Sequence, residues 1–547
     1  MRVQLPQVAS AAGPAPSASV PADGRRRLDW FEILLLAVFG ALSMWVVALD
    51  VARAITNGLV WTGTDGFYIV DQMQYLAWIQ SVAHHGLVAN LFVLRATPAD
   101  YFQPAILISG AITAAGVPSW IALLLWKPVA VVGLFLAIRA LANRMFPGRF
   151  ERRTALTLGL LFASFSAVYG SLGIVGDMMS VWDSWGYPFG LIAVALVVFG
   201  LMRYDRARAA GRIDWVPGVL GGIAATLHPW QGETMILIVI GAELIRWRDI
   251  RLWWQARQWR RLGLPALTLV LVGLPLLYYL LLGHLDLSWS LARVNSKHAF
   301  PWSAIAIGIA PLAVVAALGY RGRPQSFLEL LLRVWAPAAV VIYVFSATGL
   351  SATPLHAFDG ITIPLAMLAV KGVRATRLRT IPRGRLVAGL AVAAGVIPGN
   401  AYAVDIAPAA VAPASGNANF ITKDEHAALR YLAKDSTPGG VLTQFYMGEA
   451  VPGATGRHTL VGDCLWSEPA CMPRSNNADA LFQGTMSRAQ SRQFVIDSGA
   501  RFLLASCNTP DVNLQRRLGS KLIVSATRFG CATVYQVAAT AATAATS

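Results

Sequence analysis

The chain has 547 residues, of which 56% are hydrophobic and only 13% are charged. About a quarter of the residues in soluble domains are charged, so this composition excludes an ordinary soluble protein and indicates a lipid bilayer as the solvent. The formal net charge is +17, yet the basic residues form short clusters between long apolar runs. Such clusters are typical of membrane topology signals and of contacts with anionic lipid, so we expect no nucleic-acid partner.

The N-terminal segment is rich in Ala, Pro, Ser and Gly without an apolar core, and residues 1–28 are predicted to form a disordered cytoplasmic tail. Three arginines at 25–27 then precede an apolar run from Trp30 to Val51. This run is long enough to predict a membrane-spanning anchor rather than a cleaved signal. The Ala- and Arg-rich, Lys-poor composition is typical of high-GC bacteria and is actinobacterial-like.

Eleven apolar stretches can each cross about 30 Å of hydrocarbon, which predicts an α-helical, polytopic membrane domain over residues 29–404. The basic clusters alternate between them, so the positive-inside rule places the N-terminus in the cytoplasm and the C-terminus outside the plasma membrane. The shorter segment 104–117 is predicted to be a re-entrant or interfacial helix, because another crossing would break this alternation. The predicted spans are 30–51, 119–143, 154–176, 186–203, 215–229, 231–246, 263–283, 303–320, 332–350, 354–371 and 385–404.

With this topology, acidic and histidine side chains gather in the outer loops, whereas the inner loops are mostly arginine. An outer surface of this kind can bind an anionic or hydroxyl-rich ligand and supply a carboxylate base, although polar residues are also ordinary in solvated loops. The outer residues are Asp65, Asp71, His84, His85, Asp177, Asp183, His228, Glu233, His284, Asp286, Arg293, Lys297, His298, His356 and Asp359.

The first outer loop is the most informative. Apolar residues recur at helical spacing after Asp71, at Met73, Leu76, Ile79 and Val82, which predicts a short amphipathic helix along the membrane interface. Asp71 lies at its N-terminal end. One hypothesis is that Asp71 caps the helix. The other is that its carboxylate, held at the membrane surface, takes a proton from an acceptor hydroxyl.

The run Asp71-Gln72-Met73-Gln74-Tyr75 resembles a motif of the GT-C class of glycosyltransferases, membrane enzymes that use polyprenyl-phosphate sugars. In that class the first outer loop commonly carries Asp-Glu followed by Tyr three positions later, and here Gln72 replaces the second acid. The likeness continues with Gln103-Pro104 at the start of a second short helix and a long span beginning near Trp120. The resemblance implies a GT-C-like fold of about eleven transmembrane helices, juxtamembrane helices and a C-terminal extracytoplasmic domain.

The same resemblance implies a function. It is the inverting transfer of a hexosyl or pentosyl unit from a polyprenyl-phosphate donor to a cell-wall polysaccharide, lipoglycan or protein acceptor, in contact with membrane lipid. Asp71 would be the catalytic base, with Asp65 in reserve and with Gln72 and Tyr75 in the substrate-binding motif. The lipid phosphate is the leaving group, so no nucleotide or metal cofactor is needed. The missing second acid disfavours a metal-dependent version, and a divalent cation remains the alternative.

Three basic residues are candidates for binding the lipid phosphate. Lys127 lies within a span and is followed by Pro128, and an ionisable residue there either faces a polar cavity or extends toward the interface. Arg293 and Lys297 are outer basic residues that run against the positive-inside trend, which suggests phosphate neutralisation, with ordinary solvation as the alternative.

Two further outer segments hold substrate-binding candidates. His228 and Glu233 lie at the predicted outward tip of a hairpin over 215–246, broken by Pro229. The other segment contains Asp177 and Asp183, and we expect one of these two aspartates to contact substrate. Tryptophans nearby are either sugar-stacking residues or interface anchors. No metal-ligand spacing is recognised in these segments.

A change in composition marks the C-terminal part. Residues 405–422 are predicted to be a linker, 423–537 a small extracytoplasmic α/β domain, and 538–547 a disordered tail. Helices are expected over 423–432, 487–498 and 510–518, and strands over 441–446, 501–506, 521–525 and 532–537. All four cysteines fall here, which indicates disulfides in an oxidising compartment. We favour Cys464–Cys471 and Cys507–Cys531 among three possible connectivities.

Two other functions fit the same features. A transporter or flippase for a lipid-linked precursor would use buried charges to pass a head group, although the expected internal repeat is not visible. A non-catalytic assembly protein of the cell envelope would use Asp71 only as a helix cap.

Overall fold

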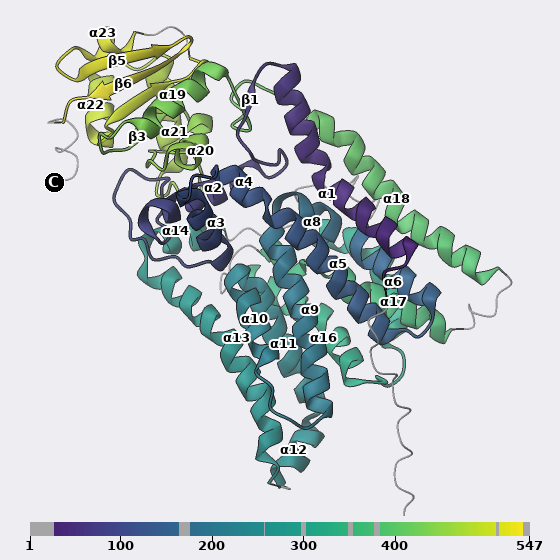
Figure 1. Ribbon diagram of the computed structural model, residues 1–547. Coiled ribbons are helices and arrows are strands. Elements are labelled where there is room, and N and C mark those ends of the chain that lie inside the picture. Colours follow the sequence, from purple (N-terminus) through teal and green to yellow (C-terminus); the bar gives the residue numbers. More distant parts are fainter. Residues whose placement is uncertain are drawn as a thin grey trace, which may run out of the picture.

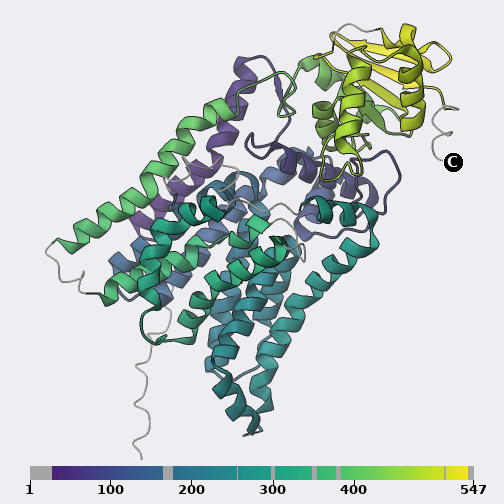
Figure 2. The same cartoon turned by 180° about the vertical axis from the view of Figure 1, so that it is seen from behind.

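The computed structural model describes residues 27–163, 176–255, 257–296, 302–347, 354–376, 383–509 and 513–539. Long helices form a bundle, and a smaller domain of helices and strands sits on one end of it (Figure 1). Seen from behind, α12 (Trp247–Gln255) lies at the end of the bundle far from this domain (Figure 2). The fold is thus mostly helical, as predicted.

Seven helices within the described ranges are long and apolar enough to cross a membrane, and each overlaps a predicted span. The buried share of the apolar segment rises from 17% in α18 to 78% in α9, so α9 lies inside the bundle while α18 keeps most of its apolar surface exposed. The helices involved are α1 (Trp30–Thr56), α4 (Ser119–Leu124) with α5 (Trp126–Met145), α9 (Pro188–Ala209), α13 (Trp259–Leu285), α15 (Trp302–Ala317) with the short η3 (Leu318–Tyr320), α16 (Phe327–Ala347) and α18 (Gly384–Ala410).

The other four predicted spans correspond to shorter helices. The span expected at 154–176 begins with α6 (Arg149–Leu161), and its residues 164–175 lie outside the described ranges. α10 (Val216–Leu227) and α11 (Pro229–Ile245) meet at His228, because Pro229 has no backbone N–H to continue the first helix. The region 354–371 is not one helix. A 3₁₀ turn, η4 (Pro354–Phe358), precedes α17 (Thr362–Ala375), and Gly360 at φ 72 breaks the path between them.

Short helices cover the end of the bundle beneath the C-terminal domain. α2 (Ile69–His85) packs against α3 (Pro104–Ala114), and α14 (Leu287–Asn295) lies at the same end (Figure 1). An 11-residue helix such as α3 is about 16 Å long, too short to cross a bilayer, which agrees with an interfacial helix at 104–117. α8 (Ser180–Gly186), preceded by the turn η2 (Gly176–Met178), leads into α9.

The C-terminal domain is built on a four-stranded sheet with the order β3-β4-β6-β5. β3 (Val441–Thr443) is parallel to β4 (Phe502–Ala505), and β6 (Ala532–Val537) is antiparallel to both β4 and β5 (Ile523–Phe529). The helices of the domain are α19 (Lys423–Lys434), α20 (Phe445–Thr455), α21 (Cys471–Phe482), α22 (Arg488–Ser498) and α23 (Leu514–Leu518). The predicted strands and helices are therefore present with somewhat different boundaries. Both favoured disulfides form, Cys464–Cys471 and Cys507–Cys531.

The connection between the two parts is shorter than the predicted linker over 405–422. α18 continues to Ala410, because the alanine-rich sequence favours helix. β2 (Phe420–Ile421) then pairs antiparallel with β1 (Val60–Trp61), in the loop between α1 and α2. This pairing joins the start of the C-terminal domain to the loop that leads into α2. The predicted tails at 1–28 and 538–547 lie almost entirely outside the described ranges.

Gly448 in α20 provides a test of how the C-terminal domain packs. A Cβ at Gly448 would overlap the backbone carbonyl oxygen of Val461, which cannot rotate away. Gly448→Ala is therefore expected to destabilise the domain by about 1–3 kcal/mol, as overpacking in a core does. Thermal unfolding of the detergent-solubilised protein measures this loss. The matched control is Gly389→Ala in α18, where a Cβ meets nothing within 4 Å. Equal stability of the two variants would contradict this packing.

Candidate functional site

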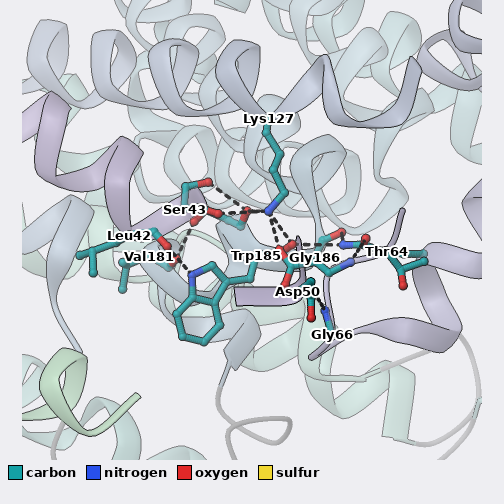
Figure 3. Close-up of polar contacts among 12 residues, drawn as sticks. Leu42, Ser43, Asp50, Thr64, Gly66, Lys127, Val181, Trp185 and Gly186 are labelled. Carbon is teal, nitrogen blue, oxygen red and sulfur yellow. Dashed lines mark hydrogen bonds and ion pairs between the residues drawn. The ribbon is translucent and has the colours of Figure 1, made fainter. Parts of the chain in front are cut away.

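A buried ion pair joins two of the predicted site residues. Lys127 in α5 and Asp65 in the loop between α1 and α2 are 3% and 0% exposed, and Lys127 Nζ lies 2.6 Å from Asp65 Oδ2. The ammonium also donates to the backbone carbonyls of Ser43, Ser184 and Trp185, at 3.2, 3.1 and 2.8 Å (Figure 3). Because these four acceptors already occupy the three N–H donors of the ammonium, Lys127 anchors the loop and is not available to a lipid phosphate.

Gln72, which stands where the GT-C motif has a second acid, connects this loop to α8. The backbone N–H of Asp65 donates to Gln72 Oε1 at 2.7 Å. The side-chain NH₂ of Gln72 donates to the carbonyls of Trp185 and Gly186, at 3.1 and 3.3 Å. An ionised glutamate has no donor for these carbonyls, so the amide fits the position where a second acid would not.

Asp50, near the end of α1, ties the same loop to the C-terminal domain. Asp50 Oδ2 accepts from the Gly66 backbone N–H and Asp50 Oδ1 accepts from the Asn419 side chain, both at 2.9 Å. Thr64 donates to the Asn419 side-chain oxygen at 2.6 Å. Figure 3 shows Asp50, Gly66 and Thr64 gathered near Lys127. The loop is thus fixed from two sides before α2 begins.

Asp71 lies in the first turn of α2 and is not its cap. The helix begins at Ile69, with Tyr68 as the N-cap residue. Asp71 is half-buried, and its Oδ2 accepts a hydrogen bond of 2.7 Å from the hydroxyl of Tyr187, which precedes α9. The capping hypothesis is therefore replaced by a carboxyl group within the first turn, near the positive end of the helix dipole.

His228, His356 and Asp359 form a buried cluster beside Tyr187. His228 lies at the junction of α10 and α11, His356 in η4, and Asp359 directly after it. His228 Nδ1 is 3.5 Å from Asp359 Oδ2, and His356 Nδ1 is 3.8 Å from Asp359 Oδ1. The rings of His356 and Tyr187 are 5.5 Å apart, so Tyr187 links this cluster to Asp71. His228 is only 6% exposed, because η4 packs against the junction.

Asp183 and Trp230 complete the surroundings of the cluster. A Cβ on Gly190 would lie 3.5 Å from Asp359 Oδ2 and 3.8 Å from Asp183 Oδ2, so the glycine lets both carboxylates approach α9. The ring of Trp230 lies 4.8 and 4.7 Å from the two histidine rings. Trp230 therefore packs against both histidines and forms one side of the cluster. The histidine and carboxylate donors are of the types that bind a metal ion.

The C-terminal domain brings the carboxyl group of Asp463 close to Asp71, and Glu449 lies close to Asp463. Burial and then the charge of Asp71 raise the pKa of Asp463 to about 7. Burial and then Asp463 raise the pKa of Glu449, on α20, to about 8. α20 packs directly on α2. The seam between the bundle and the C-terminal domain therefore contains acids from both parts.

The remaining predicted site residues lie in several places. Tyr75 is half-buried in α2, with its ring 5.2 Å from that of Phe189. Glu233 is half-buried in α11, and Arg293 is half-buried in α14. Lys297 and His298 lie outside the described ranges, as does the side chain of Asp177. Of the predicted site residues, the structure thus gathers Asp71, Asp183 and His228 around Tyr187 and pairs Lys127 with Asp65.

Sequence reasoning did not single out Tyr187 or Asp463, and it placed His356 and Asp359 only in the general outer inventory. The spacing of His356 and Asp359 is a usable signal, because residues three apart lie on one face of a helical turn. Tyr187 and Asp463 have no such signal, since each meets Asp71 only through tertiary packing.

Comparison with known proteins gives structural neighbours alone, since no family model and no curated protein matches the sequence. The oligosaccharyltransferase AglB of Archaeoglobus fulgidus is 13% identical, with a TM-score of 0.49 over 87% of this chain and 70% of that one. ArnT from Cupriavidus metallidurans is 15% identical, with a TM-score of 0.48 over 93% of this chain and 98% of that one.

AglB has been solved with an inhibitory peptide and a dolichol-phosphate, and ArnT with undecaprenyl phosphate. Both bound lipids are polyprenyl phosphates. Because the TM-scores of AglB and ArnT are below 0.5, the likeness does not support any residue's role, and those roles rest on the contacts given above.

The buried ion pair yields a test of the role of Lys127. Lys127→Met leaves the Asp65 carboxylate buried without its cation, which typically costs about 3–5 kcal/mol. The double variant Asp65→Asn with Lys127→Met removes both charges and is expected to recover most of that loss. Thermal unfolding and the monodisperse yield in size-exclusion chromatography report both effects. A Lys127→Met variant as stable as the unmodified protein would contradict the structural role.

The buried acids Asp463 and Glu449 at the seam should make the stability of the folded protein depend on pH. The folded-state pKa values of Asp463 and Glu449, about 7 and about 8, exceed their ordinary values of 3.8 and 4.5. At pH values between the ordinary and the folded-state pKa values, the folded state therefore binds more protons than the unfolded state. These two protonated acids stabilise the folded state. Their stabilising contribution is complete below about pH 4 and is lost as the pH rises through about 7 to 8.

Thermal unfolding of the C-terminal domain should therefore occur at a lower temperature at about pH 8.5 than at about pH 5.5. The double variant Asp463→Asn with Glu449→Gln, which cannot ionise at either position, should show a flatter profile. An unchanged slope in this variant would contradict the burial of these acids.

Proposed function

We propose that the chain is a glycosyltransferase that moves a sugar, with inversion, from a polyprenyl-phosphate donor to an acceptor hydroxyl. The observation that carries the proposal is the Asp71 carboxylate. It is held by Tyr187 in the first turn of α2, at the seam where the C-terminal domain meets the bundle. A half-buried carboxylate in this position can accept a proton while remaining accessible to an acceptor.

The reaction forms one bond and breaks another at the anomeric carbon. The acceptor oxygen attacks this carbon as Asp71 takes its proton. The bond from the anomeric carbon to the phosphate oxygen breaks, and polyprenyl phosphate departs with the electron pair. The attack and the departure occur on opposite faces of the sugar, which inverts the configuration. Tyr187 positions the base, because its hydroxyl hydrogen bond fixes one carboxylate oxygen.

Arg293 is our candidate for neutralising the departing phosphate, together with Lys297 beyond it in the chain. Arg293 lies on α14, and Trp289 of the same helix packs against Trp78 of α2 and Trp466 of the C-terminal domain, with ring centroids 5.9 and 4.6 Å apart. α14 therefore borders the seam that holds Asp71. A guanidinium can bind two phosphate oxygens at once.

The C-terminal domain would bind the acceptor. Asp463 and Glu449 retain protons to near-neutral pH, so each can donate a hydrogen bond to an acceptor oxygen as well as accept one. Trp466, beside Asp463, belongs to an aromatic cluster of a kind that packs against sugar rings. A polysaccharide, lipoglycan or protein of the cell envelope offers the required hydroxyl group.

The seam between the bundle and the C-terminal domain, which contains Asp71, would face the outside of the plasma membrane. Two disulfides lie in the C-terminal domain, which suits an oxidising compartment. The arginine-rich α12 region lies at the other end of the bundle, as expected for a cytoplasmic face (Figure 1). The N-terminus would then be cytoplasmic.

Replacing the base tests this function. Asp71→Asn keeps the size of the side chain but cannot accept the proton, and is expected to lower sugar transfer by about 10²–10⁴-fold. Tyr187→Phe should lower it less, by roughly tenfold, because only a positioning hydrogen bond is lost. The measurement is transfer from a synthetic polyprenyl-phosphate sugar by the purified protein in lipid nanodiscs.

The matched control is Asp497→Asn, an exposed aspartate on α22 that accepts from Gln493. It should transfer sugar at the rate of the unmodified protein. Full transfer by a folded Asp71→Asn variant would refute the base. It would leave the transporter and the assembly protein as the alternatives, since neither requires a base at this position.

A further inference from the structure

We propose that His228, His356 and Asp359 form a binding site for one divalent cation of the zinc class. The cation would join the α10–α11 junction to η4. The site goes beyond the proposed function, because it can bind a cation whether or not Asp71 acts as a base. Asp71 is not one of its ligands.

The spacing of the donor atoms suits a metal ion better than direct hydrogen bonds. One ligand atom from each residue lies within 4.8 Å of the others. The two nitrogen-to-oxygen separations, 3.5 and 3.8 Å, exceed the usual length of a hydrogen bond. Two ligands on a tetrahedral zinc ion with bonds of about 2.0–2.1 Å lie about 3.3 Å apart. A contraction of a few tenths of an ångström in each of these two nitrogen-to-oxygen separations would therefore bring them to the spacing of neighbouring zinc ligands.

Burial supports the same conclusion. His228 and Asp359 are 7% and 0% exposed at the side chain, and His228 Nδ1 makes no hydrogen bond within the described ranges. Gln231, one turn into α11, is fully buried, and its Oε1 likewise has no hydrogen-bond partner among the described residues. Buried polar atoms are rarely left without hydrogen-bond partners. A bound cation can be the partner of a ring nitrogen such as His228 Nδ1 or of an amide oxygen such as Gln231 Oε1.

The ligand set is chemically consistent. Two imidazoles and one carboxylate are a known zinc combination, and they leave a fourth position for water or another oxygen ligand. Asp183 and Asp359 both approach Gly190, so Asp183 borders the site, but it lies outside the group of ligand atoms that are within 4.8 Å of one another. The ring of Trp230 packs on both imidazoles and restricts access of solvent.

A second group of metal-ligand residues, Asp424, Cys507 and Cys531, does not compete for this assignment. Its two cysteines are joined in a disulfide, so their sulfurs are not thiolate ligands.

Cobalt substitution tests the site directly. Tag-free protein in detergent is stripped with a chelator and titrated with Co²⁺, whose visible ligand-field absorption reports nitrogen and oxygen coordination. Metal analysis after dialysis gives the stoichiometry. We expect one Co²⁺ or Zn²⁺ per chain in the unmodified protein. In His228→Gln and His356→Gln we expect at least a roughly tenfold weaker affinity and an altered spectrum. His84→Gln, an exposed histidine on α2, is the matched control and should bind as the unmodified protein does.

Thermal unfolding supplies the second readout. Added Zn²⁺ should raise the unfolding temperature of the unmodified protein and of His84→Gln, but not that of His356→Gln, because only a folded state with the site is stabilised. Asp71→Asn should keep the cobalt spectrum, which separates a failure of this site from a failure of the proposed base. The proposal is overturned if the unmodified protein holds no stoichiometric cation, or if both histidine variants bind with unchanged affinity.

Discussion

The buried contact between the Lys127 ammonium and the Asp65 carboxylate fixes the geometry of the loop from which the rest of the site is built. Removing two charges from water is costly, and the cost is offset here because carbonyls from α1 and α8 also accept from the ammonium. Three helices and the loop are therefore held at one point. Gln72 extends this network by binding Asp65 and two carbonyls of α8.

These contacts explain how a loop at the end of the bundle can hold a carboxylate in one position. Asp71 is the neighbour of Gln72 in the first turn of α2, so the network that immobilises Gln72 also sets the direction of Asp71. Tyr187 reaches Asp71 from the start of α9, one residue after Gly186, whose carbonyl accepts from Gln72. The proposed base and its proposed positioning residue are thus fixed by the same few contacts. The Asp50–Asn419 contact holds the C-terminal domain to this loop.

The sequence alone predicts the parts of this architecture that depend on local chemistry. Apolar length locates the seven long helices, alternation and turn residues locate the strands, and the cysteine spacing favours the two disulfides that form. Pro229 correctly marks a helix break at His228. The apolar composition of 354–371 predicts one span, but Gly360, at a positive φ, separates η4 from α17.

The site is less predictable, since its contacts join residues that are far apart in the chain. Lys127 was recognisable as a buried cation, but its partner was not, because 62 residues separate it from Asp65. A phosphate role was therefore equally consistent with the sequence. Asp71 was placed at the correct end of α2 by helical spacing, whereas Tyr187 and Asp463 reach it only after the bundle and the C-terminal domain have packed.

The central claim is that the sugar is transferred at the seam that contains Asp71. A cryo-EM structure of the protein with a non-hydrolysable polyprenyl-phosphonate sugar tests it most directly. Our account predicts that the anomeric carbon faces the Asp71 carboxylate, with the phosphonate on the opposite face of the sugar and toward α14. Density for the head group at the opposite end of the bundle, beside the arginine-rich α12, would contradict the account.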